Sequence, residues 1–196
     1  NDYHKFRYVL SFMYETLRVY PVVIPIGRVT HKPEKITTGG RDYILPADCG
    51  MVVNNTGVHW NPSFWPSPEI VEPKRFMAAL PNAYDPKDPS KQEVDPTASP
   101  RNTHWIRGSF MGFSEGARAC PGRKFAMSEY VCFFAHLLRN YKLKLGPGAD
   151  RDFVEKSYGW RSAGSPVTLA PPEDVPIELE PRFKIADDDR RDSMEV

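Results

Sequence analysis

The sequence predicts an α+β fold with few helices, and three observations support this prediction. Two stretches, residues 6–20 and 121–141, repeat apolar residues at spacings of three and four, as an amphipathic helix does. Short apolar runs bounded by glycine and proline indicate the strands of a small antiparallel sheet. The 20 prolines among 196 residues favour irregular connections over a bundle of long helices.

The first helix is expected over residues 6–20, and Pro21 should end it, because the residue before a proline is pushed out of the α region. Its apolar face would consist of Phe6, Val9, Leu10, Met13, Leu17 and Tyr20. Strands are then expected in VVIPIGRVTH, RDYILP and GMVVNN, with TTGG and PADCG as the turns between them.

The middle of the chain, residues 54–108, is rich in Pro, Asn, Asp and Trp and shows little periodicity apart from a helical turn at SPEIV. The strongest helix is expected from Pro121 to about Tyr141, and it should be the buried one. Its apolar residues are Phe125, Val131, Phe134, Leu137, Leu138 and Tyr141. YKLKL, PVTL and VPIELEPR indicate further strands, and residues 182–196 form a polar tail.

Composition excludes several classes of protein. Lys and Arg number 26 against 25 Asp and Glu, so no overall field marks a binder of nucleic acid or anionic membranes. The three cysteines, Cys49, Cys120 and Cys132, are widely spaced, which argues against a disulfide framework or a zinc site and favours a reducing compartment. No apolar run is long enough to span a membrane, and the helical pattern starts so near Asn1 that the chain should begin inside an element.

The stretch FSEGARACPG places Cys120 between Gly116 and Gly122 and near Arg118. With Cys120 as N-cap and Pro121 as the first helical residue, a thiolate would lie at the positive end of a helix. The glycines would admit a bulky ligand, and the arginine could hold a carboxylate. This chemistry fits the proximal side of a haem; a buried structural cysteine and a nucleophilic cysteine are the alternatives.

The same stretch resembles the F-x-x-G-x-R-x-C-x-G signature of the cytochrome P450 family. The matching residues are Phe113, Gly116, Arg118, Cys120 and Gly122. ETLR resembles the E-x-x-R helix motif of that family through Glu15 and Arg18, and PKRF resembles its P-x-R-F segment through Arg75.

Glu15 and Arg18 lie one helical turn apart, and Arg75 could complete an ion network with them. Without the other motifs, an ordinary surface contact would be the better interpretation of this pair. VHWNPSFWPSPEIVEPKRF is similar to a further family region, although Asn61 replaces the usual Asp and Val71 the usual Phe.

The resemblance implies that residues 1–196 are the C-terminal, haem-proximal portion of a single, mainly α cytochrome P450 domain. It would contain a small antiparallel sheet, the E-x-x-R helix, a long irregular loop and the helix after the cysteine loop. Residues 80–108 are similar to an insert of fungal members. The oxygen-handling helix and the membrane anchor of the family precede the E-x-x-R helix and are expected outside this chain. The complete protein is then expected at the cytosolic face of the endoplasmic reticulum membrane, with no membrane segment in this chain.

By resemblance, Cys120 is the catalytic axial ligand of the iron of haem b. The other expected cofactor contacts are Phe113, Gly116, Arg118, Gly122 and His59. The implied activity inserts one atom of dioxygen into a lipophilic organic substrate, with electrons from NADPH through an NADPH-cytochrome P450 reductase. No nucleic acid and no metal besides haem iron is expected. A non-catalytic fragment that cannot hold haem, and a family member that rearranges peroxides or dehydrates its substrate, are the alternatives.

The family also suggests where a substrate would bind. The expected pocket residues are Val23, Ile24, Ile26, Val167 and Leu169, and the alternative for them is sheet core. Some relatives grip a propionate through an arginine near the position of Pro25, so Arg118, with His59, would carry more of that role. Arg123 and Lys124 would attract an acidic reductase or form a solvated face.

Overall fold

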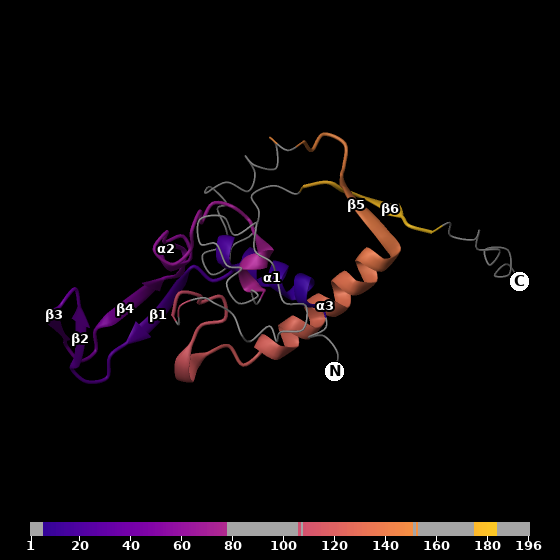
Figure 1. Ribbon diagram of the computed structural model, residues 1–196. Coiled ribbons are helices and arrows are strands. Elements are labelled where there is room, and N and C mark those ends of the chain that lie inside the picture. Colours follow the sequence, from indigo (N-terminus) through magenta and orange to yellow (C-terminus); the bar gives the residue numbers. More distant parts are fainter. Residues whose placement is uncertain (1–5, 78–105, 107, 151, 153–174, 184–196) are drawn as a thin grey trace, which may run out of the picture.

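The structure is a computed structural model that describes residues 6–77, 106, 108–150, 152 and 175–183 (Figure 1). Helix α1 (Arg7–Val19) lies at the centre, and three helical segments contact it. These segments are the short α2 (Asn55–His59), the 3-10 helix η2 (Pro73–Phe76) and the long α3 (Arg123–Asn140). A second 3-10 helix, η4 (Gly116–Arg118), precedes α3. The described part confirms an arrangement of few helices and small antiparallel sheets.

The strands form three two-stranded antiparallel sheets. The pairs are β1 (Pro25–Val29) with β4 (Gly50–Asn54), β2 (Glu34–Thr38) with β3 (Arg41–Leu45), and β5 (Tyr141–Leu145) with β6 (Ile177–Pro181). In Figure 1 the β1–β4 and β2–β3 ribbons extend to one side of α1, and β5–β6 lies on the other side beyond α3. The expected strands YKLKL and VPIELEPR are thus confirmed, and the structure shows that they pair with each other. PVTL and residues 184–196 lie outside the described residues.

Strand β2 was not expected from the sequence, which assigned Thr37 and Thr38 to a turn. The turn is shorter: Gly39 and Gly40 alone make it, at φ of 56° and 73°. Two consecutive residues with positive φ are what a tight two-residue hairpin requires, and glycine adopts them without steric cost. The threonines before the turn are therefore free to pair in the strand.

Helix α1 ends at Val19, as Pro21 predicts, and the expected face is buried in part. Leu10 and Met13 are buried, whereas Phe6 at the start of that face is 45% exposed. The core next to α1 is aromatic and draws on four separate segments, through Tyr14, Trp65, Phe76 and Phe110. The Tyr14 ring lies 5.6 Å from both Phe76 and Phe110 between centroids, stacked on the first and edge-on to the second.

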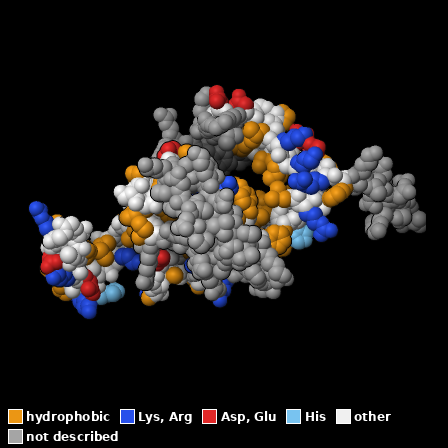
Figure 2. Space-filling view, in the orientation of Figure 1, with side chains coloured by type: hydrophobic (Ala, Val, Ile, Leu, Met, Phe, Trp, Pro, Cys, Tyr) orange, Lys and Arg blue, Asp and Glu red, His pale blue; other side chains and the backbone are white. Residues whose placement is uncertain are grey.

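The prediction that the helix after the cysteine is the buried one is wrong for the described residues. Of the residues in α3, only Val131 is buried, while Phe125 is 72% exposed. At 3.6 residues per turn, Phe125 points roughly 120° away from Val131 around the helix, so one neighbour cannot cover both. Figure 2 shows hydrophobic side chains open to the surface along the arm formed by α3, β5 and β6.

Two local predictions also differ from the structure. SPEIV forms a turn closed by the Ile70 N–H on the Ser67 carbonyl at 3.1 Å, and the helical residues come later, in η2. Pro73 starts η2, where its missing N–H costs no hydrogen bond. The first strand begins only at Pro25, so Val23 and Ile24 belong to an extended connection that is exposed.

Candidate functional site

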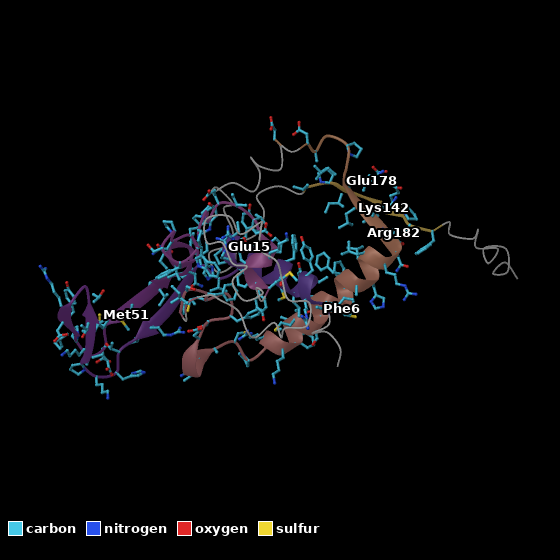
Figure 3. All side chains as sticks on the ribbon, viewed as in Figure 1. Phe6, Glu15, Met51, Lys142, Glu178 and Arg182 are labelled. Atoms are coloured by element: carbon cyan, nitrogen blue, oxygen red, sulfur yellow. The ribbon has the colours of Figure 1, made fainter. Side chains whose placement is uncertain are left out.

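A cluster of charged side chains lies at the centre of the fold, on the inward face of α1. Glu15 accepts hydrogen bonds from Arg18 Nε and Nη2, each at 2.8 Å, and Arg75 Nε lies 3.4 Å from Glu15 Oε1. Glu15 and Arg18 have no exposed surface, and Arg75 is 6% exposed. The structure thus brings the three residues of the expected network together, around the labelled Glu15 in Figure 3.

Backbone groups make further hydrogen bonds to this ion cluster. Glu15 Oε1 also accepts from the Glu72 N–H at 2.8 Å, and Arg75 donates to the carbonyls of Pro66 and Ser67 at 2.6 and 2.8 Å. Arg18 Nη1 donates to the His59 carbonyl at 3.0 Å. Buried charges are tolerated when they are paired and hydrogen-bonded in this way. The cluster therefore fixes residues 59–76 against α1.

The cysteine loop, residues 113–122, folds back on itself ahead of α3. The Cys120 N–H donates to the Phe113 carbonyl at 2.9 Å, and η4 lies between these two residues. The N-cap of α3 is Gly122, so the expectation that Cys120 is the N-cap and Pro121 the first helical residue is wrong. The thiol lies two residues before the cap, and both Cys120 and Arg118 are exposed.

Phe113 joins this loop to the aromatic core. Its ring meets the Tyr14 ring edge-on at 6.4 Å, and the Arg123 guanidinium lies 5.8 Å from the Phe113 ring and 5.9 Å from the Tyr14 ring. Arg123 also donates to Tyr14 Oη at 3.2 Å. Arg123 thus contacts both α1 and the loop, although it is exposed, as is the neighbouring Lys124.

Sequence reasoning missed Arg28. From β1, its Nη2 donates to Ser114 Oγ at 2.9 Å, which places a second guanidinium at the cysteine loop. The family resemblance suggested a cation at the position of Pro25, three residues earlier. The signal was present as the lone charged residue of VVIPIGRV, but no local pattern says which loop such a residue will meet.

His59 is buried, whereas Arg118 is exposed. His59 has no exposed surface, and its Nε2 accepts from the Met111 N–H at 2.8 Å. Burial and the nearby charge of Arg18 lower the pKa of His59 to about 4, so the ring is neutral at pH 7. In this position His59 presents no exposed atom to a cofactor, contrary to the expected role beside Arg118.

The residues expected to line a substrate pocket differ in their exposure. Val23 is 45% and Ile24 is 38% exposed, whereas Ile26 in β1 is buried. Val167 and Leu169 lie outside the described residues. Val23 and Ile24 therefore present apolar surface that a substrate could contact. Ile26 belongs to the sheet core instead, which was the alternative interpretation for these residues.

The chemistry of the cysteine loop fits a haem. An exposed sulfur at Cys120 is a soft ligand for iron, and Arg118 and Arg28 supply cations for two carboxylates. Gly116 has a φ of 77°, which favours glycine, and a Cβ at Gly122 would lie 3.8 Å from Cys120 Sγ. A side chain at Gly122 would therefore be in van der Waals contact with the sulfur.

Comparison with known proteins identifies the family. A family model described as Cytochrome P450 matches residues 1–166, so the chain belongs to the cytochrome P450 family. Cytochrome P450 monooxygenase prx9 of Penicillium rubens is 37% identical over 94% of the chain, and so is monooxygenase ORF6 of Penicillium roqueforti. The chain spans only 32% of the length of each of these relatives.

The fold agrees with this family. A crystal structure of a cytochrome P450 (CYP102L1) matches 92% of the chain with a TM-score of 0.63 at 24% identity, and the match covers 33% of that protein. The retinoic acid-bound cyanobacterial CYP120A1 matches 89% of the chain with a TM-score of 0.62 at 20% identity.

None of the helices in the described part of the chain is both long and apolar enough to cross a membrane.

Proposed function

We propose that the intact protein carrying this chain is a haem-thiolate monooxygenase in which Cys120 is the axial ligand of haem b. The exposed thiol, held on a loop just before α3 in a chain of the cytochrome P450 family, is the observation that carries this proposal. The first relatives compared are named monooxygenases, which favours oxygen insertion over peroxide rearrangement.

The residues of the loop have distinct roles in this proposal. The bound haem supplies the activation of dioxygen, and the protein supplies the thiolate, the orientation and the counter-charges. Cys120 Sγ would donate electron density to the iron, while Gly116 and Gly122 leave room for the porphyrin. Phe113 holds the loop against the aromatic core. Arg118 and Arg28 would neutralise the propionates.

The ion cluster has a structural role. Glu15, Arg18 and Arg75 hold residues 59–76 against α1, and α1 contacts Phe113 of the cysteine loop through Tyr14. This support would keep the thiol in place when a ligand binds. We further propose that a lipophilic substrate binds near Val23 and Ile24. Electrons would come from NADPH through a membrane-bound reductase that docks on the face carrying Lys124. The enzyme would act at the endoplasmic reticulum.

Replacing the proposed ligand tests the function directly. In the intact protein, Cys120→Ser should abolish the spectrum of the reduced carbon monoxide complex that requires a thiolate, together with NADPH-dependent oxygenation. Cys49→Ser and Cys132→Ser are matched controls that should leave the band position unchanged. An unchanged band in Cys120→Ser would overturn the assignment, and turnover of a lipid peroxide without NADPH would favour the isomerase or dehydratase class.

The isolated residues 1–196 should bind haem weakly and show no oxygenation. Large apolar side chains on several elements are exposed in the described part of the chain, among them Val52, Phe125, Phe133 and Ile177. Such a surface favours association over a monodisperse monomer. A haem titration followed by the carbon monoxide difference spectrum checks this, and stoichiometric thiolate-ligated haem would contradict it.

A further inference from the structure

His59 connects two parts of the site that are far apart in sequence. Its backbone carbonyl accepts from Arg18 in the ion cluster, while its ring accepts from the N–H of Met111, just ahead of the cysteine loop. The ring also stacks on Phe110, 5.3 Å between centroids and 13° between planes. A single buried residue at the end of α2 therefore contacts both the charged centre and the approach to Cys120.

The protonation of His59 follows from these contacts. Because Nε2 accepts a hydrogen bond from Met111, the ring must carry its proton on Nδ1. Nδ1 is buried and makes no hydrogen bond within the described part of the chain. The ring is therefore held in place by its acceptor contact with Met111 and by its stack on Phe110.

Two backbone hydrogen bonds connect Met111 with the segment that carries the thiol. The Met111 carbonyl accepts from the Ser114 N–H at 2.9 Å, which closes a turn at the start of the loop. Phe113, inside that turn, accepts from the Cys120 N–H at 2.9 Å. A hydrogen bond that holds the Met111 N–H therefore also holds the turn from Met111 to Ser114. Because Phe113 in this turn binds the Cys120 N–H, the turn determines the position of the thiol.

We propose that His59 is a positioning residue for the thiolate loop: its Nε2 lone pair holds the Met111 N–H and thereby sets the position of Cys120 relative to α1. The proposal rests on the proposed haem-thiolate function, since the position of the thiol matters only if it binds iron. It assigns His59 a role through the loop rather than a contact with a propionate.

The proposal requires an acceptor at this position and not merely a ring of the right size. Phenylalanine would preserve the stack on Phe110 but leave the partly buried Met111 N–H without a partner. Glutamine would place its carbonyl oxygen close to the position of Nε2 and restore the acceptor. Loss of one buried hydrogen bond shifts an equilibrium by about tenfold.

The experiment compares His59→Phe with His59→Gln in the intact haem protein. The measured quantity is the ratio of thiolate-ligated to thiolate-free reduced carbon monoxide complex across a urea series. His59→Phe should lower this ratio about tenfold at a fixed urea concentration, and His59→Gln should stay within about twofold of the unmodified protein. The exposed His31 offers matched controls, because His31→Phe and His31→Gln should leave the ratio unchanged.

The outcomes separate this proposal from the function on which it depends. If both His59 variants keep the ratio, or both lose it equally, the acceptor role is wrong while the thiolate assignment stands. If His59→Phe does not load haem, the test rests on His59→Gln alone. A fraction of thiolate-ligated complex near that of the unmodified protein supports the positioning role of His59, and absence of the thiolate band overturns it. If the unmodified protein gives no thiolate band, the proposed function itself fails.

Discussion

The two long helices of this chain, α1 and α3, have very different surroundings. Helix α1 buries apolar, aromatic and charged residues together, including Glu15 and Arg18 with no exposed surface. Helix α3 is longer and carries more aromatic residues, yet only Val131 is buried among its residues. The difference shows that burial depends on neighbours: α1 has η2, α2 and Phe110 around it, whereas α3 is contacted mainly by α1 and β5.

Ion pairs show the same contrast. The pairs on the arm, Lys142 and Lys144 with Glu180, are exposed, and Figure 3 shows this end of the molecule at the labelled Lys142, Glu178 and Arg182. Water screens such pairs, and each contributes little to stability. The ion cluster under α1 is shielded from water, so removing one partner leaves a charge that nothing else neutralises.

The largest expected effect comes from breaking the buried cluster. Glu15→Ala in the intact protein leaves Arg18 and Arg75 buried without their carboxylate, which should lower the free energy of unfolding by about 3–5 kcal/mol. Thermal or urea denaturation followed by circular dichroism measures this. The matched control, Glu180→Ala, should cost under about 1 kcal/mol. Equal losses of unfolding free energy for the two variants would mean that burial does not make the ion cluster under α1 stronger than the exposed ion pairs of Glu180.

Acid should act on the α1 region through His59. Its pKa is lowered to about 4 by burial and by Arg18, against an ordinary value of 6.5. The unfolded chain therefore takes up a proton first as pH falls, and stability is lost between pH 6.5 and 4, by about 3 kcal/mol in total. The stabilisation is fully present above that window.

Urea denaturation at pH 7, 6, 5 and 4 measures this loss. The titrating carboxylates contribute to both proteins alike, so the difference between unmodified protein and His59→Gln isolates the histidine. The variant should lose less stability across the window. Parallel curves for the two proteins would show that His59 does not carry this pH dependence.

The smallest effect is expected on the exposed arm. In the isolated chain, Phe125→Ser should change the free energy of unfolding by under about 0.5 kcal/mol, because the side chain is 72% exposed. Leu10→Ala in α1 should cost about 2–5 kcal/mol under the same conditions. Urea denaturation at low protein concentration compares them. A loss as large as that of Leu10→Ala would show that α3 is packed after all.

Local chemistry explains which features were predictable from the sequence. Pro21 ends α1, and Glu15 pairs with Arg18 one turn away, because a proline and a helical spacing act over short distances. Arg75 lies far from both in sequence, and the resemblance of PKRF to a family motif, not a local pattern, predicted that it joins them. The exposure of Phe125 was not predictable, since periodicity reports which residues share a face and not what covers it. The contact of His59 with Met111 joins residues separated by 52 positions, and no local pattern specifies such a pair.

Ser114 shows why the cysteine loop is not a self-contained module. It adopts a φ of 58°, a left-handed conformation that a side chain disfavours, and the contact that steadies its hydroxyl comes from Arg28 in β1. A designer who grafted residues 109–122 onto another scaffold would transfer Cys120, Arg118, Gly116 and Gly122. The graft would leave behind the guanidinium of Arg28 and the imidazole of His59. Such a transplant would carry the complete sequence signature and still lack the supports that give the thiol its place.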